Sequence, residues 1–433
     1  MEIKCIKLDD LYRPVTEKKQ IVRYILPNET AIVSDPNQTV IKESDLTHKS
    51  AHRKKVICPI FHECGGCDFL HMTYDYQLEL KQENVENLFK ENFNDVKINE
   101  IIKSEQPLHY RHKVVLSATT SKKKLRLGLY REQTKKVIPF LDCFIHDKST
   151  NQVLRTIEML LNKYKIPAYD IDTNQGILKH VLIRKSYARK DLMVVFVTNG
   201  NLLPNAKKIS QDLVKAHDQV KTTIQNIHKK KTHLVLLSEE KVIYGPGYII
   251  DQIGDISFKL SAQSFYQINP EQMFKLYNKA IEMANISPTD VILDTYSGIG
   301  TLSLLLSKKA KKVYAIEVNQ DAHKDALDNK IFNKMTNIEF ILGDVGEKMK
   351  EIKQEIDILF MDPTREGASL DFLNDVLLLK PKKIVYISCE PKTQVRDLKT
   401  LKPYYHIIDV QPVDMFSQTT HVESIVLLSL KTA

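Results

Sequence analysis

The sequence predicts an α/β protein in which a parallel sheet with helices on both faces follows an α+β region. After residue 263, short apolar runs alternate with helical patterns, which is typical of parallel strands joined by crossover helices. Between about 108 and 262, strand-like runs instead follow one another with few helices between them, which is typical of an α+β domain. A chain of 433 residues has room for two to four domains.

The C-terminal region contains seven strand-like runs. They are VILDTY, KVYAIEV, IEFILGD, IDILFMD, KIVYISC, HIIDVQP and VESIVLLSL, and helical patterns lie between the first six. The last two are separated only by VDMFSQTTH, which is too short for a crossover helix, so we expect the final strand to run antiparallel beside its predecessor. Six alternating strands and a reversed seventh resemble the seven-stranded, Rossmann-like domain of S-adenosylmethionine-dependent methyltransferases.

The region before residue 263 is predicted in less detail. The runs QIVRYIL and ETAIVSD indicate short strands, although no glycine precedes Gly65, which is unusual for a small barrel. A helix is expected over 74–93, followed by strands and by helices in NQVLRTIEMLLNKY and at 204–216. The expected strands are YRHKVVLSAT, KLRLGLYRE, KVIPFLDCFI, HVLIRKSYA, DLMVVFVT and THLVLLSE. The glycine-rich stretch YGPGYIIDQIGD marks a boundary, so we expect units at 1–55, 56–262 and 263–433.

Charge and hydropathy limit the class of protein. The 63 basic and 54 acidic residues give a net charge of +9, and the basic residues gather in short clusters such as Lys122–Arg131. Such clusters can neutralise phosphates, but they are equally typical of a solvated surface and do not establish nucleic-acid binding. No apolar run approaches the length of a membrane span, and the first residues carry charges, so we expect a soluble cytoplasmic protein without membrane contact.

The cysteines are clustered. Cys58, Cys64 and Cys67 fall within ten residues, and Cys143 is the natural fourth member of the group. In a cytosolic chain such clustering indicates a metal site or catalysis rather than disulfides. Three close thiols with a distant fourth suit an iron–sulfur cluster, whereas zinc sites more often show two close pairs. The residues alone leave iron–sulfur and zinc equally open, and Cys5 has no assigned role.

Glycines and acids end three successive strands of the C-terminal region. The first strand runs into Asp294 and then Gly298 and Gly300, which allow a tight turn and close approach of a ligand. Glu317 ends the second strand, where an acid suits ribose hydroxyls, and Asp344 ends the third, where it can face an adenine edge. Acids also end strands simply as caps, but three in succession favour a nucleotide-like cofactor.

Three further residues are expected at the same edge of the sheet. Asp362 ends the fourth strand and Cys389 the fifth, and the carboxyl ends of such strands form the ligand edge of an open α/β sheet. Because the last strand is reversed, Glu423 at its start can face Cys389. A thiolate adding to C6 of uracil turns C5 into a nucleophile for a methyl group, and a carboxylate then removes the C5 proton. Asp362 and Arg365 can hold the pyrimidine edge.

Other interpretations of these residues are weaker. A lone Cys389 is more often a buried, inert cysteine, and Glu423 alone could be a surface residue. Methyltransferases of base amino groups require an aromatic residue after the Asp-Pro pair, where Thr364 and Arg365 stand. RNA cytosine-C5 enzymes place a cysteine directly after that segment, and none is present.

The motifs SFYQIN, DTYSGIGTLSL, MDPTREG, YISCEPKTQVRDL and HVESIVLL, in this order, resemble the RNA uracil-C5 methyltransferase family, which makes 5-methyluridine in bacterial rRNA and tRNA. The resemblance covers about 58–433. It implies Cys389 as the nucleophile and Glu423 as the proton acceptor. It also implies contacts to S-adenosylmethionine from Gln267, Tyr296, Glu317, Asp344 and Asp362. Ser297 and Thr364 depart from the family pattern, which often has Cys and a second Pro there.

The resemblance also bears on the cysteines, the N-terminus and the substrate. It implies a 4Fe–4S cluster on Cys58, Cys64, Cys67 and Cys143, in a central domain that presents RNA. A TRAM domain often comes first in the family, and residues 1–55 would be a shortened or degenerate version. The cysteine motif is similar to that of the 23S rRNA group, so we expect a flipped or loop uridine of that RNA, bound by a monomer. A tRNA enzyme is the alternative, and a non-catalytic iron–sulfur RNA-binding protein is less favoured.

Overall fold

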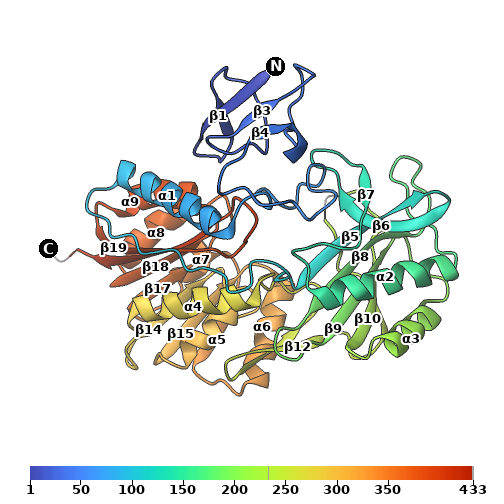
Figure 1. Ribbon diagram of the computed structural model, residues 1–433. Helices are drawn as coiled ribbons and strands as arrows, with labels where there is room; N and C mark the ends of the chain where they lie inside the picture. Colours follow the sequence, from blue (N-terminus) through green and yellow to red (C-terminus); the bar gives the residue numbers. More distant parts are fainter. Residues whose placement is uncertain (233, 432–433) are drawn as a thin grey trace.

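The computed structural model describes residues 1–232 and 234–431 of the chain. These residues form a small N-terminal sheet, a seven-stranded central sheet, a two-stranded hairpin and a seven-stranded C-terminal sheet. The N-terminal sheet lies above the junction of the two larger units (Figure 1). The mixed α/β class expected from the sequence is confirmed. No helix in the described part of the chain is both long and apolar enough to cross a membrane.

The N-terminal sheet is antiparallel, in the order β2-β1-β3-β4. Its strands are β1 (Glu2–Leu8), β2 (Pro14–Thr16), β3 (Thr30–Ile32) and β4 (Leu46–His48). The run ETAIVSD contains β3, but the strand expected over QIVRYIL is wrong, because only Arg23 makes an isolated bridge there. The corners are turned without glycine, since Tyr12 (φ 59°), Lys19 (φ 55°) and Asn28 (φ 65°) adopt left-handed backbone conformations.

The central sheet has the order β11-β10-β9-β8-β5-β6-β7. Only β9 and β10 are parallel, because α3 (Ala206–Ala216) joins them as a crossover helix. Helices α2 (Lys148–Lys163) and α3 share an apolar core with the sheet. The strands are β5 (Lys113–Ser121), β6 (Lys124–Tyr130), β7 (Val137–Pro139), β8 (Leu178–Lys185), β9 (Leu192–Thr198), β10 (Val220–Ile227) and β11 (Glu240–Tyr244).

Two strands of the central sheet differ from the expectation. The strand expected over THLVLLSE is wrong, because residues 234–239 form no strand and β11 begins only at Glu240; His233 lies outside the described residues. The sequence analysis also missed β10, whose residues are VKTTIQNI. Polar residues of β10 are buried and satisfied by hydrogen bonds, as where the Asn226 amide donates to the Leu237 carbonyl at 2.6 Å. Because this strand contains no continuous apolar run, a search of the sequence for such runs does not detect it.

The hairpin of β12 (Ile249–Ile253) and β13 (Ile256–Leu260) lies where the boundary between units was expected. It packs against α6 (Gln320–Phe332) of the C-terminal unit, and its apolar residues belong to the same core as those of α6. The side-chain oxygen of Asn329 accepts the backbone N–H of Lys259, and that of Asn333 accepts the N–H of Ser257. The expected boundary at 262 therefore follows a hairpin that already contacts the C-terminal unit.

The C-terminal sheet contains all seven expected strands, in the order β16-β15-β14-β17-β18-β20-β19. The first five strands in this order are parallel, and β20 runs antiparallel to both of its neighbours. The strands are β14 (Val291–Thr295), β15 (Lys312–Glu317), β16 (Ile338–Leu342), β17 (Ile358–Met361), β18 (Lys383–Ser388), β19 (Tyr405–Val413) and β20 (Glu423–Leu430). The strand order reverses beside β14, which places the end of that strand next to the end of β17.

Helices cover both faces of this sheet. On one face lie α4 (Pro270–Ala284), α5 (Thr301–Ser307) and α6. On the other lie α7 (Val345–Met349), α8 (Leu370–Leu379) and α9 (Pro391–Leu401), joined by α1 (Tyr74–Asn92). Figure 1 shows α1 beside α9, although the two helices lie far apart in the sequence. Ile98 and Ile102 then bridge Val410 and Val413 at the outer edge of β19. A segment from the first quarter of the chain thus completes the C-terminal unit.

Candidate active site

Cys389 directly follows β18, and Glu423 is the first residue of the neighbouring strand β20. In the antiparallel ladder of β18 and β20, Ser388 pairs with Ser424, so the residue after Ser388 and the residue before Ser424 face each other. Glu423 is 3% exposed and also pairs with Val413 of β19. Cys389 is half-buried and starts the turn into α9. The reversed last strand thus brings a thiol and a carboxyl group to the same edge of the sheet.

Burial and mutual repulsion raise the pKa values of the acidic groups here. Burial, followed by the charges of Glu423 and Asp362, raises the pKa of the Cys389 thiol to about 11, against an opposing effect of Arg365. Burial and then Asp362 raise the pKa of Glu423 to about 8, and burial raises that of Asp362 to about 7. At neutral pH the thiol is therefore protonated, and Glu423 holds its proton in most molecules. A base of pKa near 8 is suited to moving protons near neutral pH.

A small cavity of about 100 Å³ opens beside Cys389. The guanidinium of Arg365 lies at this cavity, where it donates to the Glu390 carboxylate at 3.1 Å and approaches Nδ1 of His421 at 3.4 Å. The opposite wall comes from the turn between β1 and β2, through Leu11 and Tyr12. The N-terminal sheet therefore reaches the cavity that contains the candidate nucleophile.

The turn after β14 is shaped by two glycines in left-handed conformations. Gly300 has φ 81°, and a Cβ added there would lie 2.6 Å from the Phe340 ring, so only glycine fits. Gly298 has φ 55°, and a Cβ there would meet nothing within 4 Å, so its backbone borders open space. The N–H of Gly298 donates to Glu317 Oε2 at 2.8 Å, and the N–H of Asn319 donates to Oε1 at 2.7 Å. The carboxylate of Glu317 is thereby fixed next to the glycine turn.

A second cavity, of about 360 Å³, lies along the ends of β14, β15 and β16. Tyr296, Glu317, Asp344 and Phe372 line it, and the Tyr296 ring packs edge-on against Phe372 with centroids 5.7 Å apart. Asp344 also caps α7, because its Oδ1 accepts the N–H groups of Gly346 and Glu347. Aromatic faces beside two carboxylates suit an adenosine, whose ring stacks and whose hydroxyls donate. These residues fit the cofactor implied by the sequence.

The cysteine group surrounds a third cavity, of about 700 Å³. Cys58, Cys64, Cys67 and Cys143 all line it, and none of them forms a disulfide. Burial, followed by the charges of the other three thiols, raises the pKa of Cys67. Within residues 1–232 and 234–431, however, no three His, Cys, Asp or Glu side chains stand close enough together to hold a metal ion. Cys5 is buried in the core of the N-terminal sheet.

Comparison with known proteins identifies the family. The sequence model of the tRNA (uracil-5-)-methyltransferase family matches residues 73–431. The chain belongs to the RNA uracil-C5 methyltransferase family. A protein of Oceanobacillus iheyensis named as an uncharacterized RNA methyltransferase is 41% identical to this methyltransferase over 418 residues, which is 94% of this chain and 91% of that protein. A Staphylococcus aureus (strain MSSA476) protein with the same description is 37% identical over 401 residues, 91% of this chain and 88% of its own.

A solved structure shares the fold of the methyltransferase. It is the Pyrococcus abyssi tRNA (uracil-54, C5)-methyltransferase in complex with S-adenosyl-L-homocysteine. The match has a TM-score of 0.80 and 24% sequence identity, and it covers 99% of this chain and all of that one. This likeness shows the fold, and the family and the relatives make the chain an RNA methyltransferase.

The residues singled out by sequence fall into separate places in the methyltransferase. Tyr296, Glu317 and Asp344 share the cavity of about 360 Å³. Asp362 contributes instead to the charged surroundings of Cys389 and Glu423. Gln267 is half-buried, two residues before the N-cap of α4, and lines neither this cavity nor the one at Cys389.

Sequence reasoning missed three residues at these sites. They are Phe372 in the second cavity, His421 beside Cys389, and the buried Tyr277, whose pKa is raised by burial and then by the charges of Asp362, Asp294 and Glu423. Tyr277 and Phe372 follow the apolar spacing of their helices, so they look like ordinary core residues. His421 was within reach of sequence reasoning, because it lies two residues before Glu423 in the motif HVESIVLL.

Proposed function

We propose that this methyltransferase makes 5-methyluridine in RNA by covalent catalysis, with Cys389 as the nucleophile and Glu423 as the base. The observation that carries the proposal is that Cys389 and Glu423 come directly beyond the last pair of the β18–β20 ladder, Ser388 with Ser424, at the same edge of the sheet. A flipped uracil between them would present C6 to the sulfur and C5 to the carboxylate. A thiol and a carboxylate at one pyrimidine are the groups that methylation of uracil C5 requires.

The proposed steps use residues of this chain in order. The thiol of Cys389 and the carboxyl group of Glu423 first release their protons to solvent. The Cys389 thiolate then adds to C6 of the uracil, and the electrons of the C5–C6 double bond make C5 nucleophilic. S-adenosylmethionine supplies the methyl group that C5 takes. Glu423 then accepts the C5 proton, the C5–C6 double bond forms again, and the electrons of the C6–S bond return to the sulfur of Cys389. Asp362 and Arg365 would hold the pyrimidine edge during these steps.

For the methyl donor we propose the cavity of Tyr296, Glu317 and Asp344. Glu317 has lone pairs free for ribose hydroxyls beyond the two N–H groups that it accepts, and Tyr296 offers a ring face to the adenine. Asp344 would face the adenine edge, and Gln267 and Asp362 are proposed as further contacts. The open space beside Gly298 supports binding along the glycine turn.

We propose 23S rRNA as the substrate, because the cysteine motif resembles that of the rRNA group. We also propose that the chain divides into three units. Residues 1–55 would be a shortened TRAM-like segment, 56–262 a central RNA-binding domain, and 263–433 the methyltransferase domain. The reversed seventh strand of the C-terminal sheet supports the last assignment. A tRNA uridine is the second candidate, favoured by the fold shared with the Pyrococcus abyssi enzyme.

We also propose that Cys58, Cys64, Cys67 and Cys143 hold a 4Fe–4S cluster that stabilises the central domain. Four soft thiol ligands that line one cavity support the proposal, and zinc is the alternative. In the described part of the chain they do not stand close enough to hold a metal ion, so they would have to move together around the cluster. Iron, acid-labile sulfide and zinc should be measured after anaerobic purification. Iron with sulfide, lost in Cys67→Ser, is expected; zinc without iron would overturn the assignment.

The decisive test of the reaction compares the wild-type enzyme with Cys389→Ala. We expect the variant to bind S-adenosylhomocysteine with unchanged affinity in calorimetry, because Cys389 lies outside the proposed donor cavity. Transfer of a labelled methyl group to RNA should fall by at least ~10³-fold. Methylation of RNA by Cys389→Ala at the wild-type rate would refute covalent catalysis.

The substrate requires a separate measurement. Mass mapping of 5-methyluridine in rRNA and tRNA from a strain lacking this gene identifies the RNA that loses the modification. Loss from 23S rRNA alone is expected. Loss from tRNA alone would transfer the proposed activity to the second candidate.

A further inference from the structure

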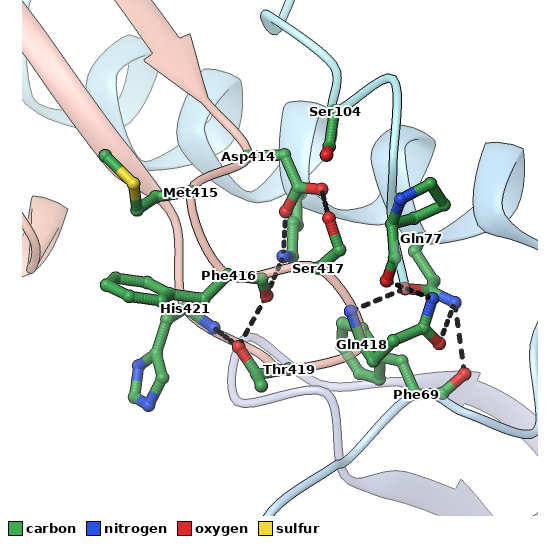
Figure 2. Close-up of polar contacts among 12 residues, drawn as sticks. Phe69, Gln77, Ser104, Asp414, Met415, Phe416, Ser417, Gln418, Thr419 and His421 are labelled. Atoms are coloured by element: carbon green, nitrogen blue, oxygen red, sulfur yellow. Dashed lines mark hydrogen bonds and ion pairs between the residues drawn. The ribbon is translucent and has the colours of Figure 1, made fainter. Parts of the chain in front are cut away.

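The loop that leads into Glu423 is held by a distant part of the chain. Residues 414–422 connect β19 to β20, and side chains of α1 contact the part of this connection that we call the 414–421 loop (Figure 2). Lys81 of α1 forms an ion pair with Asp414 at 2.6 Å between Nζ and Oδ1, and the two side chains are only 0% and 1% exposed. Lys81 Nζ also donates to the Phe416 carbonyl at 3.3 Å. A charge from the N-terminal third of the chain therefore lies in the interior beside this loop.

The second oxygen of Asp414 is also fully engaged. The hydroxyl of Tyr74, on the first turn of α1, donates to Oδ2 at 2.6 Å, and the Ser417 hydroxyl donates to the same atom at 2.5 Å. The Tyr74 oxygen in turn accepts the backbone N–H of Ser104 at 2.8 Å. Asp414 thus joins its own loop to α1 and to the segment after it through bonds that are all buried or partly buried.

Gln418 is fixed in a similar way further along the loop. Its side-chain oxygen accepts from the Gln77 amide at 3.1 Å, and its N–H donates to the Gln77 oxygen at 3.2 Å (Figure 2). Its carbonyl accepts the N–H groups of Asp68 and Phe69, at 2.8 and 3.0 Å. The backbone of Gln418 has φ 70°, a conformation that costs about 1–3 kcal/mol outside glycine and persists only where surrounding contacts enforce it.

These contacts end next to the candidate base. The Thr420 N–H donates to Asp68 Oδ2 at 3.1 Å, His421 lines the cavity at Cys389, and β20 begins at Glu423. A buried ion pair adds little net stability, because desolvation offsets its attraction; its best-supported value is in selecting one conformation. A catalytic group must be held to within about 0.5 Å of its working position.

We propose that Lys81 and Asp414 are positioning residues for Glu423, which they hold in place for proton removal through the 414–421 loop. The inference rests on the proposed roles of Cys389 and Glu423. Cys389 itself follows β18 and precedes α9, so the sheet and that helix hold it independently of the loop. Glu423 also pairs with Val413 in the sheet, but as the first residue of β20 it continues the loop directly, so displacing the loop affects the base more than the nucleophile.

The proposal predicts which step fails. With Glu423 displaced, the sulfur still adds to C6 and C5 still takes the methyl group, but the C5–H bond is not broken. The electrons that would form the C5–C6 double bond and release the sulfur remain in the C5–H bond. The enzyme should then stay joined to methylated RNA through the C6–S bond, and this adduct resists denaturation in detergent.

The experiment compares full-length variants incubated with RNA and methyl-labelled donor. Lys81→Met removes the buried positive charge. The double variant Lys81→Met/Asp414→Asn also removes the negative charge of Asp414, which would otherwise be left unpaired. Tyr74→Phe deletes only the hydroxyl that donates to Asp414, with little risk to folding. Lys90→Met is the matched control, because Lys90 is an exposed lysine on the same helix. Glu423→Gln is the reference for a lost base. Labelled adduct is quantified on denaturing gels, and kcat and KM for RNA are measured in parallel.

We expect kcat to fall by ~10-fold or more in Lys81→Met and in the double variant, with KM for RNA unchanged and labelled adduct approaching the level in Glu423→Gln. Tyr74→Phe should show a smaller change in the same direction, and Lys90→Met should match the wild type. Adduct in Glu423→Gln but wild-type levels in all three loop variants would overturn the positioning role and leave the proposed function intact. No adduct in Glu423→Gln would overturn the base assignment and the positioning role with it.

Discussion

Glu423 begins β20 beside the end of β18, which Cys389 follows directly, and the charge of Glu423 is the largest influence after burial on the pKa of that thiol. The two groups therefore cannot ionise independently. A proton leaving Glu423 makes the thiolate of Cys389 less stable, and a thiolate has the same effect on the carboxylate. The arrangement couples the proposed nucleophile and the proposed base through their charges before any substrate binds.

Thiol reactivity in Glu423→Gln tests this coupling. Burial and Asp362 raise the pKa of Glu423 to about 8, so at pH 9 the wild-type carboxylate is ionised and repels the thiolate. Glutamine removes the repulsion, which lowers the pKa of Cys389 and increases its thiolate fraction. We expect alkylation of Cys389 by iodoacetamide, followed by peptide mass spectrometry, to be several-fold faster in the variant at pH 9. The difference should shrink at pH 6.5; equal rates at pH 9 would contradict the coupling.

The same substitution should change how stability depends on pH. The ordinary pKa of a glutamate is 4.5, and in the folded protein that of Glu423 is about 8. Between these values the folded state retains a proton that the unfolded chain has released, so stability falls as pH rises through this window. Glu423→Gln lacks this loss, so its Tm should exceed the wild-type Tm by at least ~2 °C at pH 8.5, and by less at pH 5. A constant difference would refute the shifted pKa.

The two glycines of the turn after β14 should respond differently to alanine. In Gly300→Ala the new Cβ meets the Phe340 ring in addition to the strained φ, so we expect a loss of about 2–4 kcal/mol in the free energy of unfolding. Gly298→Ala has no clash and should lose only about 1–2 kcal/mol, but its Cβ enters the open space beside the glycine turn, along which we propose that the donor binds. Calorimetry should therefore show weaker S-adenosylhomocysteine binding in folded Gly298→Ala. Unchanged affinity would place the ligand elsewhere.

Replacing Glu317 should weaken binding of the methyl donor without unfolding the protein. Its carboxylate accepts two backbone N–H groups and lines the cavity of about 360 Å³. Losing a charged acceptor for the ribose costs about 1.5–3 kcal/mol, so Glu317→Ala should bind S-adenosylhomocysteine ~10–100-fold more weakly. Asp321→Ala, an exposed acid in the first turn of α6, is the control. Equal affinities of the two variants would exclude Glu317 from the donor site.

Much of the C-terminal unit could be predicted from sequence because its strands are buried apolar runs. Strands such as ILFM of β17 are buried throughout, and their ends place Glu317, Asp344 and Cys389 in a row by topology alone. The facing of Cys389 and Glu423 followed from one local fact, the short loop before β20. Here the topology of the sheet was enough to bring distant residues together.

Other features left no pattern to read. The strand β10 buries Thr222, Gln225 and Asn226, whose hydrogen bonds become visible only in the folded protein. The pairing of Lys81 with Asp414 joins residues more than three hundred positions apart, and a lysine on a helix ordinarily indicates a solvated face. Sequence periodicity shows which side of α1 is apolar, but it cannot show that α9 covers it.

The discontinuous make-up of the C-terminal unit has a consequence during synthesis. The apolar face of α1, with Val85 and Phe89, is covered by residues such as Leu398 of α9. A ribosome adds ~5–20 residues per second, so the helix waits roughly 15–60 s, while about 300 further residues are made, before its partners emerge. During that interval the apolar face of α1 stays exposed to solvent. We therefore expect newly made protein to depend on chaperones until translation is complete, and a fragment that begins after α1 to aggregate.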